Sequence, residues 1–376
     1  MTRRDLRVVV AGGGVAGLEA LLALRSFAGH SVELILVTPD DDFVYRPLEV
    51  VEPFDPRAMV RVPWQRIAAD LAVGHRRAGA QEVDLDGNRL RTTTAGELSF
   101  DVLIVATGAT PRPAIPGGIT VGAPGATERL RHLLGTLRAG HIRRLAFVVP
   151  PGVTWSLPLY ELALLTARFA REAKQEVDLS VATAESEPLE VFGSGAGETV
   201  RELLDDSSVR LATNGLVQRR VGERTWLEPP AGPRADAVVA MARLAGPYLR
   251  GLPADGDGFL TVDEHGRVEG ESDVYAAGDA TSFAVKQGGL AAQQAEAVAS
   301  EIARRAGAEV EARRFKPVLR AMLLTGEAPR YLRVALTAAA SRPERSDQSP
   351  WWPPVKIVGR HLAPYLAGHV DWVAPA

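Results

Sequence analysis

Three glycines near the start of the chain have the spacing that binds nucleotide phosphates. Gly12, Gly14 and Gly17 form a G-x-G-x-x-G motif directly after the apolar run LRVVVA (residues 6–11). The run LEALLALRSF (18–27) then reads as a helix, so the motif lies at a strand-to-helix turn. The first glycine permits a tight turn, the second lets the backbone approach a pyrophosphate, and the third lets helix and strand pack closely. The sequence therefore predicts a phosphate site at the N-terminal end of this helix, where free N–H groups and the helix dipole favour anions.

The ribose end of this site carries an unusual residue. The next strand, SVELILV (31–37), is followed by Thr38 and Pro39, where dinucleotide-binding folds usually carry an acidic side chain. The Thr38 hydroxyl can still bond a ribose oxygen. The three aspartates at 40–42 are read either as part of the site or as a solvated loop, and the sequence leaves both interpretations open.

Two later segments indicate which nucleotide is bound. The run FDVLIVATGATPRPAIPG (100–117) reads as a buried strand that ends in an ATG triplet at 106–108. The run SDVYAAGDATSF (272–283) reads as another strand, ending in Gly278 and Asp279. At the carboxyl end of a strand, Asp279 can accept a hydrogen bond from a ribityl hydroxyl, while the glycines admit the backbone of a flavin cofactor.

The three motifs, in this order, resemble the flavoprotein family with two dinucleotide-binding domains, the pyridine nucleotide-disulfide reductase superfamily. The resemblance covers about residues 5–310. It rests on the G-x-G-x-x-G motif at 12–17, called the glycine finger below, on ATG at 106–108 and on AAGDA at 276–280. It implies FAD as the cofactor, with the isoalloxazine ring near Gly278 and Asp279. The candidate cofactor-binding residues are Gly12, Gly13, Gly14, Val15, Ala16, Gly17, Thr38, Pro39, Arg46, Ala80, Ala106, Thr107, Gly108, Gly278, Asp279, Lys286 and Gly288.

Lys286 is the candidate catalytic residue. It lies between the Gly278-Asp279 segment and the helix that begins at Gly288. An ammonium group there would stabilise negative charge on a flavin or polarise a quinone carbonyl. The alternative is a solvated surface lysine, and the sequence does not choose between the two. The histidines show no metal-binding spacing, so no metal site is expected.

A second strand, finger and helix, which this family uses for NAD(P)H, is altered in this chain. In VVPPGVTWSLPLYELALL (148–165), Pro150 and Pro151 replace glycines and Trp155 stands at the position of the third glycine. Proline offers no N–H to a phosphate, and an indole fills space that a dinucleotide needs. We therefore expect a degenerate site that does not hold NAD(P)H productively.

The altered finger is similar to the sulfide:quinone oxidoreductase branch of the family. The similar residues are the segment P-x-Y-E-L-A (158–163), the segment YRPL (45–48) and the tail WWPPVKIVGRHLAPYL (351–366). Enzymes of that branch take electrons from a small reductant. The chain has no cysteine, so sulfide oxidation through a cysteine persulfide is excluded.

The fold class predicted from these motifs is α/β, with tandem Rossmann-like FAD/NAD(P)-binding domains and a short C-terminal domain. The FAD-binding domain is expected to be discontinuous, comprising residues 1–115 and 250–325. The degenerate NAD(P)-binding-like domain is expected at 116–249, and a C-terminal interface or tail segment at 326–376.

Composition narrows the partners and the location. A net charge of −3 gives no reason to expect nucleic-acid binding. No apolar run of 18 residues is present, so we expect a cytoplasmic protein without a membrane-spanning helix. The tail holds Trp351, Trp352, Tyr365 and Trp372, which suit either peripheral membrane contact or a buried domain or homodimer interface.

These observations lead to one main functional hypothesis and two alternatives. The main hypothesis is an FAD-dependent oxidoreductase that passes electrons from an unidentified small-molecule donor to a quinone-like acceptor, without cysteine chemistry. One alternative is an NAD(P)H-dependent flavoprotein reductase with a noncanonical nicotinamide site. The other is a non-catalytic flavin-binding redox sensor or assembly partner.

Overall fold

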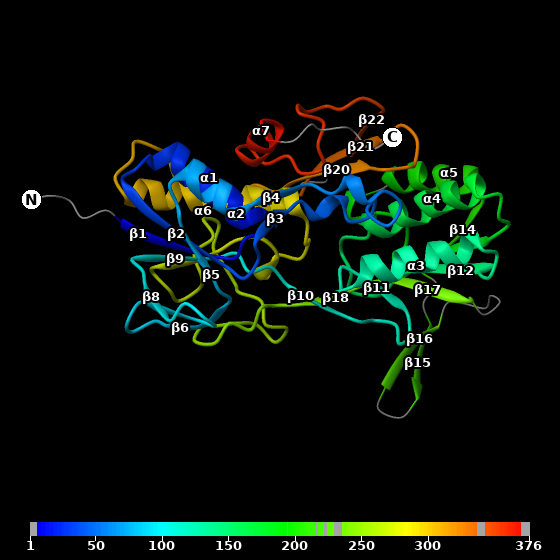
Figure 1. Cartoon of the computed structure of the whole chain (residues 1–376), viewed down its shortest axis with the longest axis horizontal. Helices are drawn as coiled ribbons and strands as arrows, with labels where there is room; N and C mark the ends of the chain where they lie inside the picture. Colours follow the sequence, from blue (N-terminus) through cyan, green and yellow to red (C-terminus); the bar gives the residue numbers. More distant parts are fainter. Residues whose placement is uncertain are drawn as a thin grey trace, which may run out of the picture.

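Two five-stranded parallel sheets lie side by side, and a smaller C-terminal unit lies across them (Figure 1). The structure, a computed structural model, describes residues 6–193, 195–214, 217–221, 224–228, 235–336 and 343–369. Short apolar runs alternate with helices along the chain, which is the pattern that produces parallel strands with helical crossovers.

The first sheet carries the glycine finger. Its strands, in spatial order, are β19 (Val274–Ala276), β9 (Val102–Val105), β1 (Leu6–Ala11), β2 (Val32–Thr38) and β5 (Gly74–Arg77). Both faces of β1 are buried: Val8 and Val10 pack toward α1 (Val15–Ala28) and α6 (Gly288–Arg305), whereas Val9 packs on the opposite face. That opposite face is covered by an antiparallel meander of β6 (Ala80–Asp84), β7 (Arg89–Thr92) and β8 (Glu97–Ser99). Burial on both sides explains why the strand reads as a continuous apolar run.

The second sheet repeats the parallel arrangement. Its strands, in spatial order, are β11 (Ile119–Val121), β17 (Ala237–Met241), β12 (Arg144–Val149), β13 (Asp178–Thr183) and β14 (Val209–Ala212). The helices of this unit are α3 (Ala126–Arg138), α4 (Leu157–Glu172) and α5 (Ala196–Asp206). The altered finger therefore lies between β12 and α4, which is the position that a second nucleotide site would have.

Short elements connect and cover the two sheets. Strands β10 (Thr110–Arg112) and β18 (Arg243–Ala245) pair where the chain leaves and re-enters the first unit. The hairpin β3 (Asp42–Val44) and β4 (Arg61–Pro63) precedes α2 (Trp64–Leu71), and a further hairpin joins β15 (Val217–Val221) to β16 (Arg224–Glu228). The C-terminal unit consists of antiparallel β20 (Val318–Leu323), β21 (Arg330–Ala335) and β22 (Glu344–Ser346), followed by α7 (Leu362–Ala367). Short 3-10 turns occur at η1 (Arg46–Leu48), η2 (Pro56–Ala58), η3 (Glu190–Phe192) and η4 (Gly278–Ala280).

The predicted α/β class with tandem Rossmann-like domains is confirmed by these two sheets. The division into residues 1–115 with 250–325, 116–249 and 326–376 stays a prediction.

Candidate functional site

The glycine finger has the geometry that its spacing predicts. Gly12 has a φ of +118°, and a Cβ there would lie 2.2 Å from the Ala106 carbonyl oxygen. A Cβ at Gly17 would lie 1.9 Å from the Gly12 carbonyl oxygen, so neither position admits a side chain. Gly14 differs, because a Cβ there would meet no protein atom within 4 Å. Gly14 is also the N-cap of α1, and no side chain caps this helix. Open space beside uncapped N–H groups fits a bound phosphate.

The other two motifs lie at the same edge of the sheet. The Ala106 N–H donates to the Ala11 carbonyl at 2.7 Å, which places the ATG triplet beside the finger. Gly278 has a φ of +76°, and a Cβ there would lie 3.0 Å from the Cβ of Ala16. Its N–H donates to the buried Gln294 Oε1 at 2.7 Å. Gln294 was not predicted, since a glutamine within a helix carries no distinguishing signal. The edge where these motifs meet is the carboxyl end of parallel strands, where α/β folds bind ligands.

Asp279 and Lys286 interact through their charges at this edge. Burial raises the pKa of the half-buried Asp279, and the Lys286 ammonium opposes that rise. Within the described part of the chain, no donor forms a hydrogen bond to the Asp279 carboxylate, so it is available to a ribityl hydroxyl. Burial lowers the pKa of Lys286 to about 8, against the opposing charges of Asp279 and Asp255. The ammonium donates to the Thr281 carbonyl and lies 3.8 Å from the centre of the Phe259 ring.

A buried tryptophan lies beneath the finger. A Cβ at Gly13 would lie 2.7 Å from Thr38 Oγ1 and 2.9 Å from Trp64 Nε1. Both side chains are fully buried, and Trp64 Nε1 has no hydrogen-bond partner among the described residues. Trp64 was not predicted as a site residue, because only the packing of α2 brings it under the finger.

The remaining predicted residues differ in their proximity to the finger. Ala80 begins β6, just after Ala78, whose N–H donates to the Thr38 carbonyl at 3.0 Å. Pro39 is exposed directly after Thr38. Arg46 is exposed, and its guanidinium forms an ion pair with Glu49 at 2.9 Å. This interaction holds the Arg46 side chain within its own turn and gives no contact with the finger.

Gly288 lies where the C-terminal tail crosses the site. A Cβ at Gly288 would lie 2.4 Å from Ile357 Cδ1 and 3.9 Å from Val15 Cγ2. The Ile357 N–H donates to the hydroxyl of buried Tyr45 at 2.7 Å. The N-terminal ends of α1 and α6 therefore meet beneath the tail.

The altered finger contacts neighbouring segments through Trp155 and Thr154, whereas a Cβ at Gly152 would meet no protein atom within 4 Å. The ring centroids of Trp155 and Phe192 lie 6.1 Å apart, so the indole packs against the loop after β13. Thr154 Oγ1 donates to the Ala284 carbonyl at 2.6 Å, which ties the finger to the segment that carries Lys286.

Glu185 is a further functional candidate, which was not predicted. It follows β13 by two residues, at the place where a Rossmann fold carries its ribose-binding acid. Its Oε1 accepts from Ser156 Oγ at 2.8 Å, and its Oε2 accepts from Tyr160 at 2.7 Å and Thr183 Oγ1 at 2.8 Å. Burial raises the pKa of Glu185, and these three hydroxyls oppose the rise. The signal was its position at the end of the strand VDLSVATAE (177–185).

The tail aromatics are only partly explained by internal packing. Trp351 packs edge-on against Tyr331 at 5.4 Å, and the Tyr365 hydroxyl donates to Asp70 at 2.9 Å. Trp352 is 88% exposed, which leaves it available to a surface outside this chain. Trp372 lies outside the described residues. No helix in the described ranges has the length and apolar character needed to cross a bilayer.

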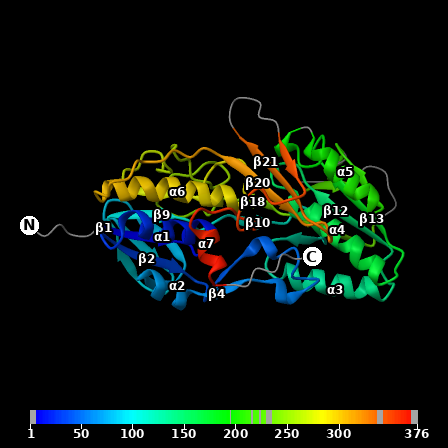
Figure 2. The same ribbon diagram turned by 90° about the horizontal axis from the view of Figure 1, so that it is seen from above.

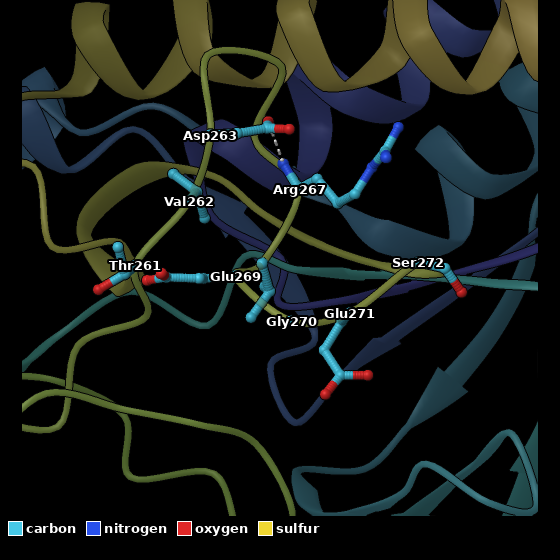
Figure 3. A pocket seen from close by; sticks show the side chains of 9 residues that line it. Thr261, Val262, Asp263, Arg267, Glu269, Gly270, Glu271 and Ser272 are labelled. Atoms are coloured by element: carbon cyan, nitrogen blue, oxygen red, sulfur yellow. Dashed lines mark hydrogen bonds between the residues drawn. The ribbon is translucent and has the colours of Figure 1, made fainter.

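A pocket elsewhere in the first unit contains none of the predicted site residues. It has a volume of about 680 Å³ and is lined by residues 261–263 and 267–272 (Figure 3). Its Asp263 accepts the N–H groups of His265 and Arg267, so this carboxylate stabilises a turn. In the part of the chain that the structure describes, no cluster of acidic and histidine side chains is suited to a metal ion.

Comparison with known proteins identifies the family. The model of the pyridine nucleotide-disulphide oxidoreductase family matches residues 6–299. The chain belongs to this family. Its members are FAD-dependent oxidoreductases, which confirms the predictions of FAD as the cofactor and of an enzyme.

Individual relatives of this family member differ in their reactions. An NADH dehydrogenase-like protein of Mycobacterium tuberculosis is 30% identical over 302 residues, which cover 73% of this chain and 72% of the relative. The sulfide:quinone oxidoreductase of Aquifex aeolicus has a similar structure, with a TM-score of 0.80 and 18% identity over 91% of this chain and 87% of that one. A ferredoxin reductase from Rhodopseudomonas palustris has a TM-score of 0.66 and 16% identity, over 88% and 82% of the two chains. These likenesses confirm the expected resemblance and leave the donor and acceptor to be proposed.

Proposed function

We propose that the protein is an FAD-dependent oxidoreductase that passes electrons from a small donor other than NAD(P)H to a quinone-like acceptor, without cysteine chemistry. When bound, FAD supplies the redox chemistry. The residues proposed to hold it are the finger at 12–17, Thr38, the triplet 106–108, Gly278 and Asp279. The open space at Gly14 supports this assignment, as does the Asp279 carboxylate, which accepts no hydrogen bond from the residues that the structure describes.

The composition of the second finger is the observation that carries the exclusion of NAD(P)H. Pro150 and Pro151 lack N–H donors, and Trp155 packs where the third glycine would leave space. Glu185 accepts three hydroxyl hydrogen bonds from the protein itself, which are the kind of bond that a ribose would otherwise supply. A nicotinamide dinucleotide would have to displace these internal contacts and would find two fewer backbone N–H donors for its phosphates.

Lys286 supports a quinone-like acceptor. Its ammonium is half-buried, beside Asp279 and against Phe259. In such a site a cation stabilises the negative charge that develops on a carbonyl oxygen as it is reduced. The likeness to a sulfide:quinone oxidoreductase supports the same acceptor class. We also propose that the tail contacts a membrane peripherally through the exposed Trp352. The formation of a homodimer stays a prediction.

Anaerobic mixing experiments test this proposal. The purified flavoprotein is mixed with NADH or NADPH while flavin absorbance is followed, and the dithionite-reduced protein is then mixed with a soluble quinone. We expect reoxidation by the quinone at enzymatic rates, roughly 1–1000 per second, and no comparable reduction by either nucleotide. Failure of several quinones to oxidise the reduced protein would exclude the proposed acceptor.

A second candidate function, NAD(P)H-dependent reduction, is favoured by the position of Glu185. A carboxylate at the end of the second strand is the usual ribose ligand for NADH, and one relative is an NADH dehydrogenase-like protein. The same mixing experiment separates the candidates, because reduction by NADH at enzymatic rates would support the second and overturn the first.

A further inference from the structure

The turn that carries Asp279 lies between two helices of the first unit. Figures 1 and 2 show α6 lying beside α1. Gly278 begins η4 and is buried, and a Cβ there would lie 3.0 Å from the Cβ of Ala16 in α1 and 3.3 Å from the Cβ of Ala291 in α6. Its φ of +76° also favours glycine. The backbone N–H and C=O of this buried residue must therefore find their partners inside the protein.

One buried side chain of α6, Gln294, holds this turn from both sides. Its Oε1 accepts the Gly278 N–H at 2.7 Å, and its Nε2 donates to Thr281 Oγ1 at 3.2 Å. The Thr281 hydroxyl donates in turn to the Gly278 carbonyl at 2.9 Å. Gln294 is 5% exposed and Thr281 is fully buried, so bulk solvent does not reach these bonds. The N–H and the C=O of Gly278 are thus both held from α6, one directly and one through Thr281.

The hydrogen-bonding needs of the two partners match an amide. The Gly278 N–H can only donate, so it needs an acceptor. The Thr281 hydroxyl gives its own proton to the Gly278 carbonyl, so its oxygen is free to accept from a donor. A carboxamide offers both groups, whereas an ionised carboxylate offers acceptors only and would add a buried negative charge near Asp279. Glutamine at position 294 therefore satisfies a requirement that a glutamate would not.

The position of the Asp279 carboxylate depends on the backbone of this turn. No described residue donates a hydrogen bond to that carboxylate, so no side-chain contact of that kind orients it. Asp279 lies between Gly278 and Thr281, the two residues that Gln294 holds. The Lys286 ammonium also donates to the Thr281 carbonyl, so the same turn supports the proposed cation.

We propose that Gln294 is a positioning residue of the FAD site, which holds the turn at 278–281 so that the Asp279 carboxylate can accept from the ribityl chain. This inference rests on the proposed role of Asp279 and extends it to a residue that acts through the turn. Loss of the amide leaves the buried Gly278 N–H without its acceptor, which is unfavourable. The turn must then move to find another partner, and the Asp279 carboxylate moves with it.

The dissociation constant of FAD measures this role. The purified FAD-loaded protein is diluted, and the release of FAD is followed by the rise in flavin fluorescence. We expect Gln294→Met to raise the dissociation constant by about tenfold. Thr281→Val should raise it less, because Gln294 still accepts the Gly278 N–H and the Thr281 N–H still donates to the Gly278 carbonyl at 3.0 Å.

A double-variant cycle with Asp279→Ala separates positioning from a general loss of structure. Asp279→Ala alone should weaken FAD binding, because it removes the proposed acceptor. If Gln294 acts through Asp279, adding Gln294→Met to Asp279→Ala should weaken binding little further. A purely structural role of Gln294 would produce the same loss in both backgrounds.

Gln293→Met is the matched control. Gln293 lies on the same helix, but its amide bonds to the Gly289 carbonyl and to both backbone groups of Val318, each at 2.9 Å. It therefore holds β20, and its loss should lower the free energy of unfolding while FAD binds as in the wild type.

The outcomes distinguish the inference from the assignment on which it rests. Additive effects of Gln294→Met and Asp279→Ala would overturn the positioning role, as would an equal loss of FAD affinity in Gln293→Met. An unchanged dissociation constant in Asp279→Ala would instead overturn the assignment of Asp279 to the ribityl chain. If Gln294→Met does not fold, Thr281→Val takes its place in the cycle, and the same comparison decides.

Discussion

Lys356 and Glu161, 195 positions apart in the chain, form a buried ion pair. The Lys356 Nζ lies 2.7 Å from Glu161 Oε1 and 2.6 Å from Oε2. The side chains are 7% and 0% exposed. Glu161 Oε1 also accepts the Leu324 N–H at 2.9 Å. Burial raises the pKa of Glu161, and the Lys356 ammonium opposes that rise. The pair ties the tail to the first turns of α4.

Removing one partner of this pair should be strongly destabilising. We expect Lys356→Met to lower the free energy of unfolding by about 3–5 kcal/mol, because it leaves an uncompensated buried carboxylate. Urea unfolding of the FAD-loaded protein measures the loss. The double variant Lys356→Met/Glu161→Gln, which removes both charges, should recover much of it. A double variant as unstable as the sum of both single variants would show that the pair is not coupled.

Gly14 should control cofactor occupancy without controlling the fold. Its φ is −88°, and a Cβ there meets only open space, so Gly14→Val should fold but obstruct the phosphate. We expect a several-fold lower ratio of FAD to protein after native purification, measured by absorbance, with little change in the stability of the apoprotein. Gly17→Ala is the contrasting variant, since its Cβ would clash with backbone and lower both quantities. Full FAD occupancy in Gly14→Val would contradict the assigned phosphate site.

Lys286 should give the quinone reaction an alkaline limit. Its pKa is lowered to about 8, so the ammonium is present below that pH and is lost above it. We expect kcat with a soluble quinone to fall as the pH rises through about 8, and to fall at least about tenfold in Lys286→Met. Lys286→Arg should retain activity to higher pH, because a guanidinium stays charged. The exposed Lys316→Met serves as the control. An unchanged pH profile in Lys286→Met would remove this lysine from the proposed chemistry.

The Tyr160 hydroxyl should stabilise the second unit through Glu185. Tyr160→Phe removes a hydrogen bond to a buried carboxylate, and we expect it to cost about 1–3 kcal/mol in urea unfolding. Tyr365→Phe removes the bond to Asp70, which lies at the surface, and should cost less. Equal losses in the two variants would show that the Glu185 cluster has no special role in stability.

The local parts of the site could be predicted from the sequence. Gly12 and Gly17 are specified by contacts with backbone atoms close by in the finger or on the neighbouring strand. Asp279 follows a recognisable buried strand, and the finger at 150–155 lacks the glycines and N–H donors of a dinucleotide site. Such features depend on the size of a side chain and on the N–H groups that a short segment offers. Both follow directly from the residue types, so the sequence is sufficient to predict them.

Other parts were decided only by the tertiary structure. Glu161, Glu19 and Glu185 read as ordinary helix or strand-end acids, and nothing local indicates which would be buried. The partner of Glu161 is Lys356, and the partners of Glu19 are the N–H groups of residues 361 and 362, so both lie far along the chain. The partners of Glu185 lie on β13 and at the start of α4. Burying a carboxylate is unfavourable unless a donor or cation compensates it. Such a donor becomes available only after the two sheets and the tail have packed together, so the sequence alone cannot specify it.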